Sequence, residues 1–276
     1  MYEIVVDGVR QAYHVAGRGP VCVAHPGGPG LDASYLRSAA LEEHFTMVYV
    51  DPAGTGGSGR PPRYGMDVYT RSLGAVVDHL GDEPVYLLGH SAGGFVTQAY
   101  ALAHPGRVAG HLLYSTAPAA DQEFWAGAMA GVAAYPQRHP DVPEAAHIPD
   151  AFRRAQAAPD DATMTAAFRE ALPVYFADFW SDREAYAPFV ATVRMSREAA
   201  TAADPVPFDV RGRLAGLTAP AVVITGRHDF IGGPRWGEML AAGIPGARHV
   251  TLEHSGHFAH IEEPDAFVAA AILLLP

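Results

Sequence analysis

The chain has 276 residues, of which 49% are hydrophobic and 18% charged, and its formal net charge at pH 7 is −11. This length and composition are typical of a soluble globular protein with one large domain or two smaller ones. The negative net charge and the scattered positions of the 19 basic residues, all of them arginines, argue against a nucleic-acid partner, which would require clustered cations.

The sequence also bears on location and cofactors. It has no uninterrupted apolar run of about 18 residues to cross a membrane, and residues 1–7 lack the basic and apolar stretches of a secretory signal. We therefore expect a cytoplasmic protein without a membrane partner. Cys22 is the single cysteine and cannot form an internal disulfide. The 14 histidines show no spacing typical of a metal site, so we expect neither a metal nor an organic cofactor.

The chain begins with a predicted hairpin, since residues 3–6 and 11–15 flank Asp7-Gly8, a dipeptide suited to a tight turn. Short apolar or β-branched runs of strand length follow at 21–24, 46–50, 85–88, 111–115, 221–225 and 248–252. Segments of helix length lie between most of them, at 67–80, 91–103, 235–242 and 264–274. This alternation predicts an α/β fold with a mostly parallel sheet covered by helices on both faces.

One glycine-rich segment imitates a dinucleotide-binding motif. Residues 54–59 satisfy G-x-G-x-x-G directly after the predicted strand 46–50. Pro61 and Pro62 follow almost at once, and two adjacent prolines cannot continue the helix whose N-terminus would hold a pyrophosphate. We therefore predict a loop here and no nucleotide site.

A second motif carries more chemical information. Gly89-His90-Ser91-Ala92-Gly93 fits G-x-S-x-G between an apolar strand and a helix-like segment. A serine hydroxyl is a weak nucleophile, so it needs an exposed position on a sharp turn, a base to take its proton and amides to face an oxyanion. This context predicts Ser91 as a nucleophile and the Ala92 N–H, at the start of a helix, as an oxyanion donor.

The alternation of strands and helices breaks between residues 119 and 215, where the sequence is rich in alanine and aromatic residues without a clear strand. This segment predicts a helical insertion that forms a cap, or lid, and the core then comprises residues 1–118 and 216–276. Most of its aromatic side chains are expected to form a helical core, and a few to line a pocket above Ser91.

A serine nucleophile needs a base and an orienting acid, which on this architecture follow it in the order acid, then histidine. Asp229 comes directly after the predicted strand 221–225, with Asp121 as the reserve. Four histidines near the C-terminus are candidates for the base: His249, His254, His257 and His260. We choose His257, because its loop follows strand 248–252 and reaches over the carboxyl edge of the sheet. The glycine-rich turn 25–30, after strand 21–24, is expected to supply the second oxyanion donor.

Five segments together resemble the α/β-hydrolase superfamily, and within it the proline iminopeptidase group of serine aminopeptidases. They are Gly-Gly-Pro-Gly at 27–30, the loop 51–58, Gly-His-Ser-Ala-Gly-Gly at 89–94, Gly-Arg-His-Asp at 226–229 and Ser-Gly-His-Phe at 255–258. The resemblance implies an α/β-hydrolase fold, with Ser91 as nucleophile, His257 as base, Asp229 as orienting acid, and Gly28 with Ala92 as oxyanion donors.

The resemblance also implies a site for a free ammonium group, which such aminopeptidases hold with two glutamates. Glu198 is the counterpart of the glutamate from the end of the cap. The second glutamate is missing, because Phe230 follows Asp229, and we expect Glu198 and Phe230 to contact the substrate. The usual His-Gly-Gly-Pro-Gly is interrupted by Pro26, and the loop 51–54 also departs from the group's pattern.

Three functions are therefore open. The main prediction is acyl transfer to water by an aminopeptidase or aminoacyl-amide hydrolase, whose partner is a small molecule or short peptide with a free amino group. The alternative is an esterase, lactonase or carbon–carbon bond hydrolase with an apolar site, favoured by Phe230 and the missing glutamate. A non-catalytic ligand-binding protein is the third, and the complete set of nucleophile, acid, base and oxyanion elements disfavours it.

Overall fold

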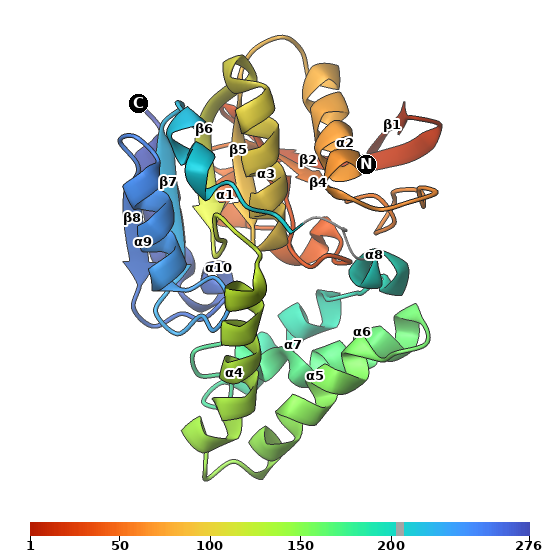
Figure 1. Ribbon diagram of the computed structural model, residues 1–276, viewed down its shortest axis with the longest axis vertical. Coiled ribbons are helices and arrows are strands. Elements are labelled where there is room, and N and C mark those ends of the chain that lie inside the picture. Colours follow the sequence, from red (N-terminus) through yellow and green to blue (C-terminus); the bar gives the residue numbers. More distant parts are fainter. Residues whose placement is uncertain (203–206) are drawn as a thin grey trace.

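The computed structural model describes residues 1–202 and 207–276. Its centre is an eight-stranded sheet in the order β1-β2-β4-β3-β5-β6-β7-β8 (Figure 1). The pairings β1–β2 and β2–β4 are antiparallel, and all the others are parallel. The strands are β1 Tyr2–Val6, β2 Val9–Gly17, β3 Val21–His25, β4 Thr46–Val50, β5 Val85–His90, β6 Val108–Tyr114, β7 Ala221–Gly226 and β8 Arg248–Leu252. The predicted mostly parallel sheet is confirmed.

Alternating side chains of the parallel strands point to opposite faces, and each face is apolar. On one face Val48, Leu87 and Val223 pack against α2 Met66–His79, α3 Ala92–Ala103 and α9 Pro234–Gly243. On the other face, Tyr49, Leu88 and Ile224 pack against α1 Ala39–Glu42, α10 Ala259–Glu262 and α11 Pro264–Ala271. Helices therefore cover both faces, as the sequence predicts for an α/β fold.

Further helices lie between β6 and β7, beyond the carboxyl ends of the parallel strands (Figure 1). They are α4 Gln122–Arg138, α5 Ile148–Gln156, α6 Asp161–Ala171, α7 Arg183–Thr192 and α8 Arg197–Thr201. Three of them begin directly after an aspartate whose carboxylate accepts a hydrogen bond from the first helical turn, Asp121 for α4, Asp160 for α6 and Asp182 for α7. None of the helices in the described part of the chain is long and apolar enough to span a membrane.

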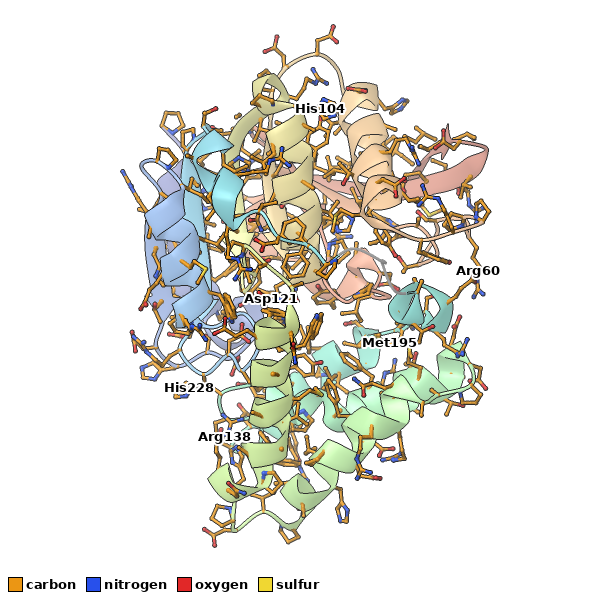
Figure 2. All side chains as sticks on the ribbon, in the orientation of Figure 1. Arg60, His104, Asp121, Arg138, Met195 and His228 are labelled. Carbon is orange, nitrogen blue, oxygen red and sulfur yellow. The ribbon has the colours of Figure 1, made fainter. Side chains whose placement is uncertain are left out.

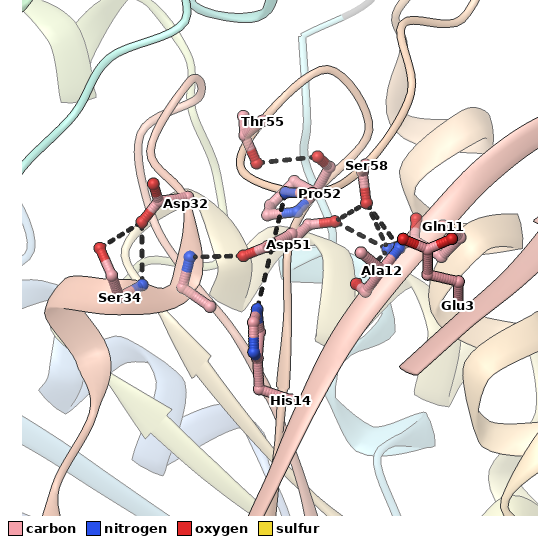
Figure 3. Close-up of polar contacts among 12 residues, drawn as sticks. Glu3, Gln11, Ala12, His14, Asp32, Ser34, Asp51, Pro52, Thr55 and Ser58 are labelled. Atoms are coloured by element: carbon pink, nitrogen blue, oxygen red, sulfur yellow. Dashed lines mark hydrogen bonds and ion pairs between the residues drawn. The ribbon is translucent and has the colours of Figure 1, made fainter. Parts of the chain in front are cut away.

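The segment that imitates a nucleotide motif is a loop held by Asp51 (Figure 3). The Asp51 carboxylate accepts hydrogen bonds from Ala33 N (3.1 Å) and Gly57 N (2.8 Å), and His14 Nε2 lies 3.3 Å from its second oxygen. The next helix, α2, begins only at Met66. The prediction of a loop over these residues is confirmed.

Candidate active site

Ser91 occupies the sharp turn between β5 and α3. Its backbone has φ 52° and ψ −121°, a strained conformation for a residue other than glycine. Two hydrogen bonds fix the turn, from Ser91 N to Tyr114 O (2.9 Å) and from Thr116 Oγ1 to Ser91 O (2.7 Å). A side chain at Gly93 would overlap the carbonyl oxygen of His25. The small residue at 93 therefore allows α3 to pack closely against the end of β3.

Asp229 and His257 lie on the loops that follow β7 and β8, and both side chains are buried. His257 Nδ1 is 2.9 Å from Asp229 Oδ2. The other carboxylate oxygen of Asp229 accepts hydrogen bonds from Ile231 N (2.9 Å) and Gly232 N (3.1 Å). The acid is thus fixed by its own loop, and its bond to Nδ1 leaves Nε2 of the imidazole for a second partner.

The other candidates for acid and base have different partners. His260 Nδ1 lies 2.9 Å from Tyr114 Oη, on the buried side of the loop. His249 Nε2 lies 2.8 Å from Thr225 Oγ1. Asp121 caps α4 and pairs with Arg211 at 2.9 Å. Among these candidates, the structure pairs only Asp229 with His257.

Ser91 and His257 line one cavity of about 430 Å³, between the sheet edge and the inserted helices. This volume suits a small-molecule ligand. Most of the wall is apolar and comes from Pro29, Leu31, Ala92, Phe95, Phe124, Trp125, Phe152, Ala155, Met164, Phe168, Met195, Ala200, Ile231 and Phe258. The polar side chains of the wall are His90, Ser91, Gln156, Tyr175, Thr201 and His257. No acidic side chain, arginine or lysine belongs to the described part of this wall.

The two expected oxyanion donors, Gly28 and Ala92, also line this cavity. Ala92 is the first residue of α3, and the first four N–H groups of a helix have no partner within it. The loop 25–30 packs closely on the nucleophile, since a Cβ built at Gly27 would lie 2.8 Å from Ser91 Cβ. Gly28 and Ala92 thus lie in the same cavity wall as Ser91, and their role as oxyanion donors stays a prediction.

The two expected substrate-binding residues lie elsewhere. Glu198, on α8, is 45% exposed at its side chain and pairs with Arg60 at 3.0 Å. Figure 2 labels Arg60, whose side chain extends toward α8. The carboxylate of Glu198 is therefore hydrated and ion-paired, which is the favourable state for a charged group. Glu198 is not part of the cavity wall. Phe230 packs its ring 5.1 Å from that of Tyr175, so it supports the wall from behind.

Sequence reasoning missed the residues that hold the histidine loop. His257 N donates to Tyr175 O (2.6 Å), so the loop is bonded to the inserted segment. The Glu262 carboxylate accepts hydrogen bonds from Ala177 N and from Gly256 N, both at 2.7 Å, and burial raises its pKa to about 7. The contacts of Tyr175 with His257 and of Ala177 with Glu262 have no local sequence signal, because the second joins residues 85 positions apart and the first spans a similar separation. Within the described residues, no group of three or more potential metal ligands is present.

Comparisons with known proteins agree with this architecture. A family model described as alpha/beta hydrolase fold matches residues 20–264. A 2-hydroxy-6-oxononadienedioate/2-hydroxy-6-oxononatrienedioate hydrolase from Cupriavidus pinatubonensis is 29% identical, over 91% of this chain and 85% of the relative. The enol-lactonase from Burkholderia xenovorans LB400 superposes with a TM-score of 0.77 at 26% identity, over 99% of both chains. An esterase from Rhodococcus sp. ECU1013 has a TM-score of 0.78 at 21% identity, over 98% and 96% of the chains, and shows the shared fold.

Proposed function

Because this chain belongs to the alpha/beta hydrolase fold family, we propose that it is a serine hydrolase that cleaves esters or lactones of small, uncharged, apolar acyl compounds. The main support for this proposal is that Ser91 and His257 line the same, largely apolar cavity. His257 is bonded to Asp229 at 2.9 Å. Similarity to an enol-lactonase supports the same reaction class.

The reaction follows from these positions. Ser91 Oγ attacks the substrate carbonyl carbon while His257 Nε2 takes its proton, and the negative charge that forms on the carbonyl oxygen is stabilised by the N–H groups of Gly28 and Ala92. Asp229 keeps the imidazole in the tautomer that accepts at Nε2 and stabilises the imidazolium. His257 then protonates the leaving oxygen. Water attacks the acyl-enzyme by the same steps and regenerates Ser91.

The charge of the cavity wall decides between substrate classes. A buried site for a charged group requires a countercharge or several hydrogen-bond partners. The described wall contains no carboxylate for an ammonium and no arginine or lysine for a carboxylate. The relative from Cupriavidus pinatubonensis, by its name, acts on a dicarboxylate. A carbon–carbon bond hydrolase is therefore our second candidate, and an ester or lactone without charge is the first.

The aminopeptidase hypothesis depends on an anchor for a free amino group. Of the two glutamates of the proline iminopeptidase group, one is replaced by Phe230 and the other, Glu198, pairs with Arg60. No described residue thus supports an anchor for a free amino group, and we favour the ester and lactone hypothesis over the aminopeptidase hypothesis.

The inserted helices contribute much of the cavity wall, and we propose that residues 119–215 act as a cap that selects the acyl group. Phe124 and Trp125 come from α4, Phe152 from α5, and Met164 and Phe168 from α6. Aromatic and thioether side chains accept apolar groups without a fixed hydrogen-bond pattern.

A substrate panel tests the proposal. The protein and Ser91→Ala are incubated with four kinds of substrate: short acyl esters, lactones, aminoacyl arylamides and an unsaturated ketone that carries two carboxylates. We expect turnover of the uncharged esters or lactones that Ser91→Ala abolishes. Preferred cleavage of aminoacyl arylamides, or of the dicarboxylate, would replace our substrate class with one of the other two. Ester turnover that survives in Ser91→Ala would overturn the assignment of the site.

A further inference from the structure

His90, the residue before Ser91, belongs to the cavity wall and joins the two halves of the candidate site. It is 1% exposed, and both nitrogens of its ring have protein partners. His90 Nδ1 is 2.6 Å from Tyr35 Oη, and His90 Nε2 is 3.0 Å from the backbone oxygen of His257. Since neither nitrogen is left for a ligand, the imidazole of His90 acts on the protein itself.

The protons of this chain of bonds can be assigned from the chemistry of its ends. A carbonyl oxygen only accepts, so His90 Nε2 carries a hydrogen and donates to His257 O. Burial lowers the pKa of His90 well below its usual value, so the ring is neutral and Nδ1 accepts from the hydroxyl of Tyr35. The same hydroxyl oxygen accepts a hydrogen bond from Gly27 N (2.6 Å). Consecutive hydrogen bonds thus link Gly27 N to His257 O through the side chains of Tyr35 and His90, and we call this series the path.

A second buried pair closes the path into a ring of contacts. Tyr114 Oη lies 2.9 Å from His260 Nδ1 and 3.1 Å from the backbone oxygen of His257. His260 Nε2 lies 2.9 Å from the backbone oxygen of Tyr35. The backbone oxygen of His257 is therefore enclosed by His90 and Tyr114, and Tyr35 is held at both its side chain and its backbone.

We propose that Tyr35 and His90 are positioning residues that set the oxyanion loop 25–30 and the base His257 relative to Ser91. This inference rests on the proposed hydrolase function. The joined segments are distant in sequence, with Tyr35 55 positions from His90 and His90 167 positions from His257. Hydrogen bonds that fix such segments hold reacting groups in place, and small displacements of reacting groups reduce rates strongly. The bonds act through the Gly27 amide and the His257 backbone, so neither side chain needs to touch the substrate.

Three variants separate the two halves of the path. Tyr35→Phe removes the acceptor for Gly27 N and the donor to His90. His90→Asn keeps a polar group near the position of Nδ1 but cannot reach His257 O, whereas His90→Gln reaches that oxygen with its amide nitrogen. Tyr49→Phe is the matched control, because Tyr49 is 0% exposed and its hydroxyl also accepts a backbone hydrogen bond, from Ser38 N at 3.2 Å.

The measurement is kcat and KM for the ester or lactone that the wild-type protein turns over, per active site titrated with a fluorophosphonate. We expect Tyr35→Phe and His90→Asn to lower kcat by about 10-fold to 100-fold with KM nearly unchanged, His90→Gln to recover part of the loss, and Tyr49→Phe to keep wild-type kcat. Wild-type kcat in Tyr35→Phe and His90→Asn would overturn the inference, as would an equal loss in Tyr49→Phe. Failure of the hydrolase proposal is distinct, because the wild-type protein would then show no turnover.

Discussion

The proposed roles of Ser91 and His257 depend on the hydrogen bond between His257 and Asp229. In Asp229→Asn the side chain keeps its size but loses the charge that stabilises the imidazolium and the acceptor that fixes the tautomer. We expect kcat to fall on the order of 10³-fold to 10⁴-fold with a small change in KM, measured by steady-state ester hydrolysis. Asp121→Asn, at the cap of α4, is the control. Equal activity of Asp229→Asn and wild type would remove Asp229 from the mechanism.

Buried histidines give the fold a predictable response to acid. His111 on β6 is 1% exposed, and burial lowers its pKa from 6.5 to about 4. The unfolded chain binds this proton more readily than the folded one, so the contribution of His111 to stability is lost as pH falls from 6.5 toward 4.

Replacing His111 by leucine therefore should reduce the acid sensitivity. When the pH falls from about 7.5 to about 5, the free energy of unfolding decreases in both proteins. We expect this decrease to be about 2 kcal/mol smaller in His111→Leu than in wild type. Urea denaturation at both pH values measures the difference. His104→Leu, at an exposed position labelled in Figure 2, controls for the loss of an imidazole. A loss in His111→Leu as large as that of wild type would show that its titration does not contribute.

At the scale of elements, the Glu262 carboxylate on α10 joins the histidine loop to the inserted segment. It accepts one hydrogen bond from each, from Gly256 N and Ala177 N. In Glu262→Gln the amide nitrogen cannot accept, so one of these N–H groups loses its partner. We expect hydrogen exchange at Ala177 or Gly256 to accelerate on the order of 10-fold.

The pH dependence of that exchange provides the check. The pKa of Glu262 is raised to about 7 by burial, so wild-type protection at these two amides should decline as pH falls below 7, after correction for intrinsic exchange. In Glu262→Gln it should be independent of pH over the same range. Mass spectrometry of the two peptides measures both, and identical protection in the two proteins would contradict the role assigned to Glu262.

Sequence reasoning placed residues correctly where their position follows directly from an element. Ser91, Asp229 and His257 each follow a strand whose run of apolar residues is evident, and the carboxyl ends of parallel strands meet at one edge. Glu198 could not be placed in this way. It lies on α8, a helix of five residues, and whether its side chain turns to the cavity or to Arg60 depends on packing that no local pattern encodes. The partners of His90 and the contact of Glu262 with Ala177 are equally non-local.

For the whole molecule, the mostly parallel sheet with helices on both faces follows from the alternation of apolar runs and helix-length segments. The shape and charge of the cavity do not, because its wall combines β-strand loops with helices of the inserted segment. Substrate class is therefore a property of the assembled molecule. Its uncharged wall moves our expectation from an amine-bearing substrate to an apolar ester or lactone.

Replacing one apolar side chain of the cavity wall tests whether the wall selects the acyl group. Phe168 of α6 is buried and faces the cavity. In Phe168→Ala the enlarged site should accept longer acyl chains, so kcat/KM for a hexanoyl ester relative to an acetyl ester should rise about 10-fold. Steady-state kinetics with the ester series measures this ratio. An unchanged ratio would show that this part of the wall does not contact the acyl group.

We infer that His257 and the adjacent amides make the hydroxyl of Ser91 nucleophilic. Mass spectrometry after reaction with an alkyl fluorophosphonate reports this nucleophilicity. We predict one adduct per chain, on the peptide that contains Ser91, which Ser91→Ala abolishes and Asp229→Asn forms far more slowly. A protein that remains unlabelled at Ser91, or that is labelled equally in Ser91→Ala, would contradict the account.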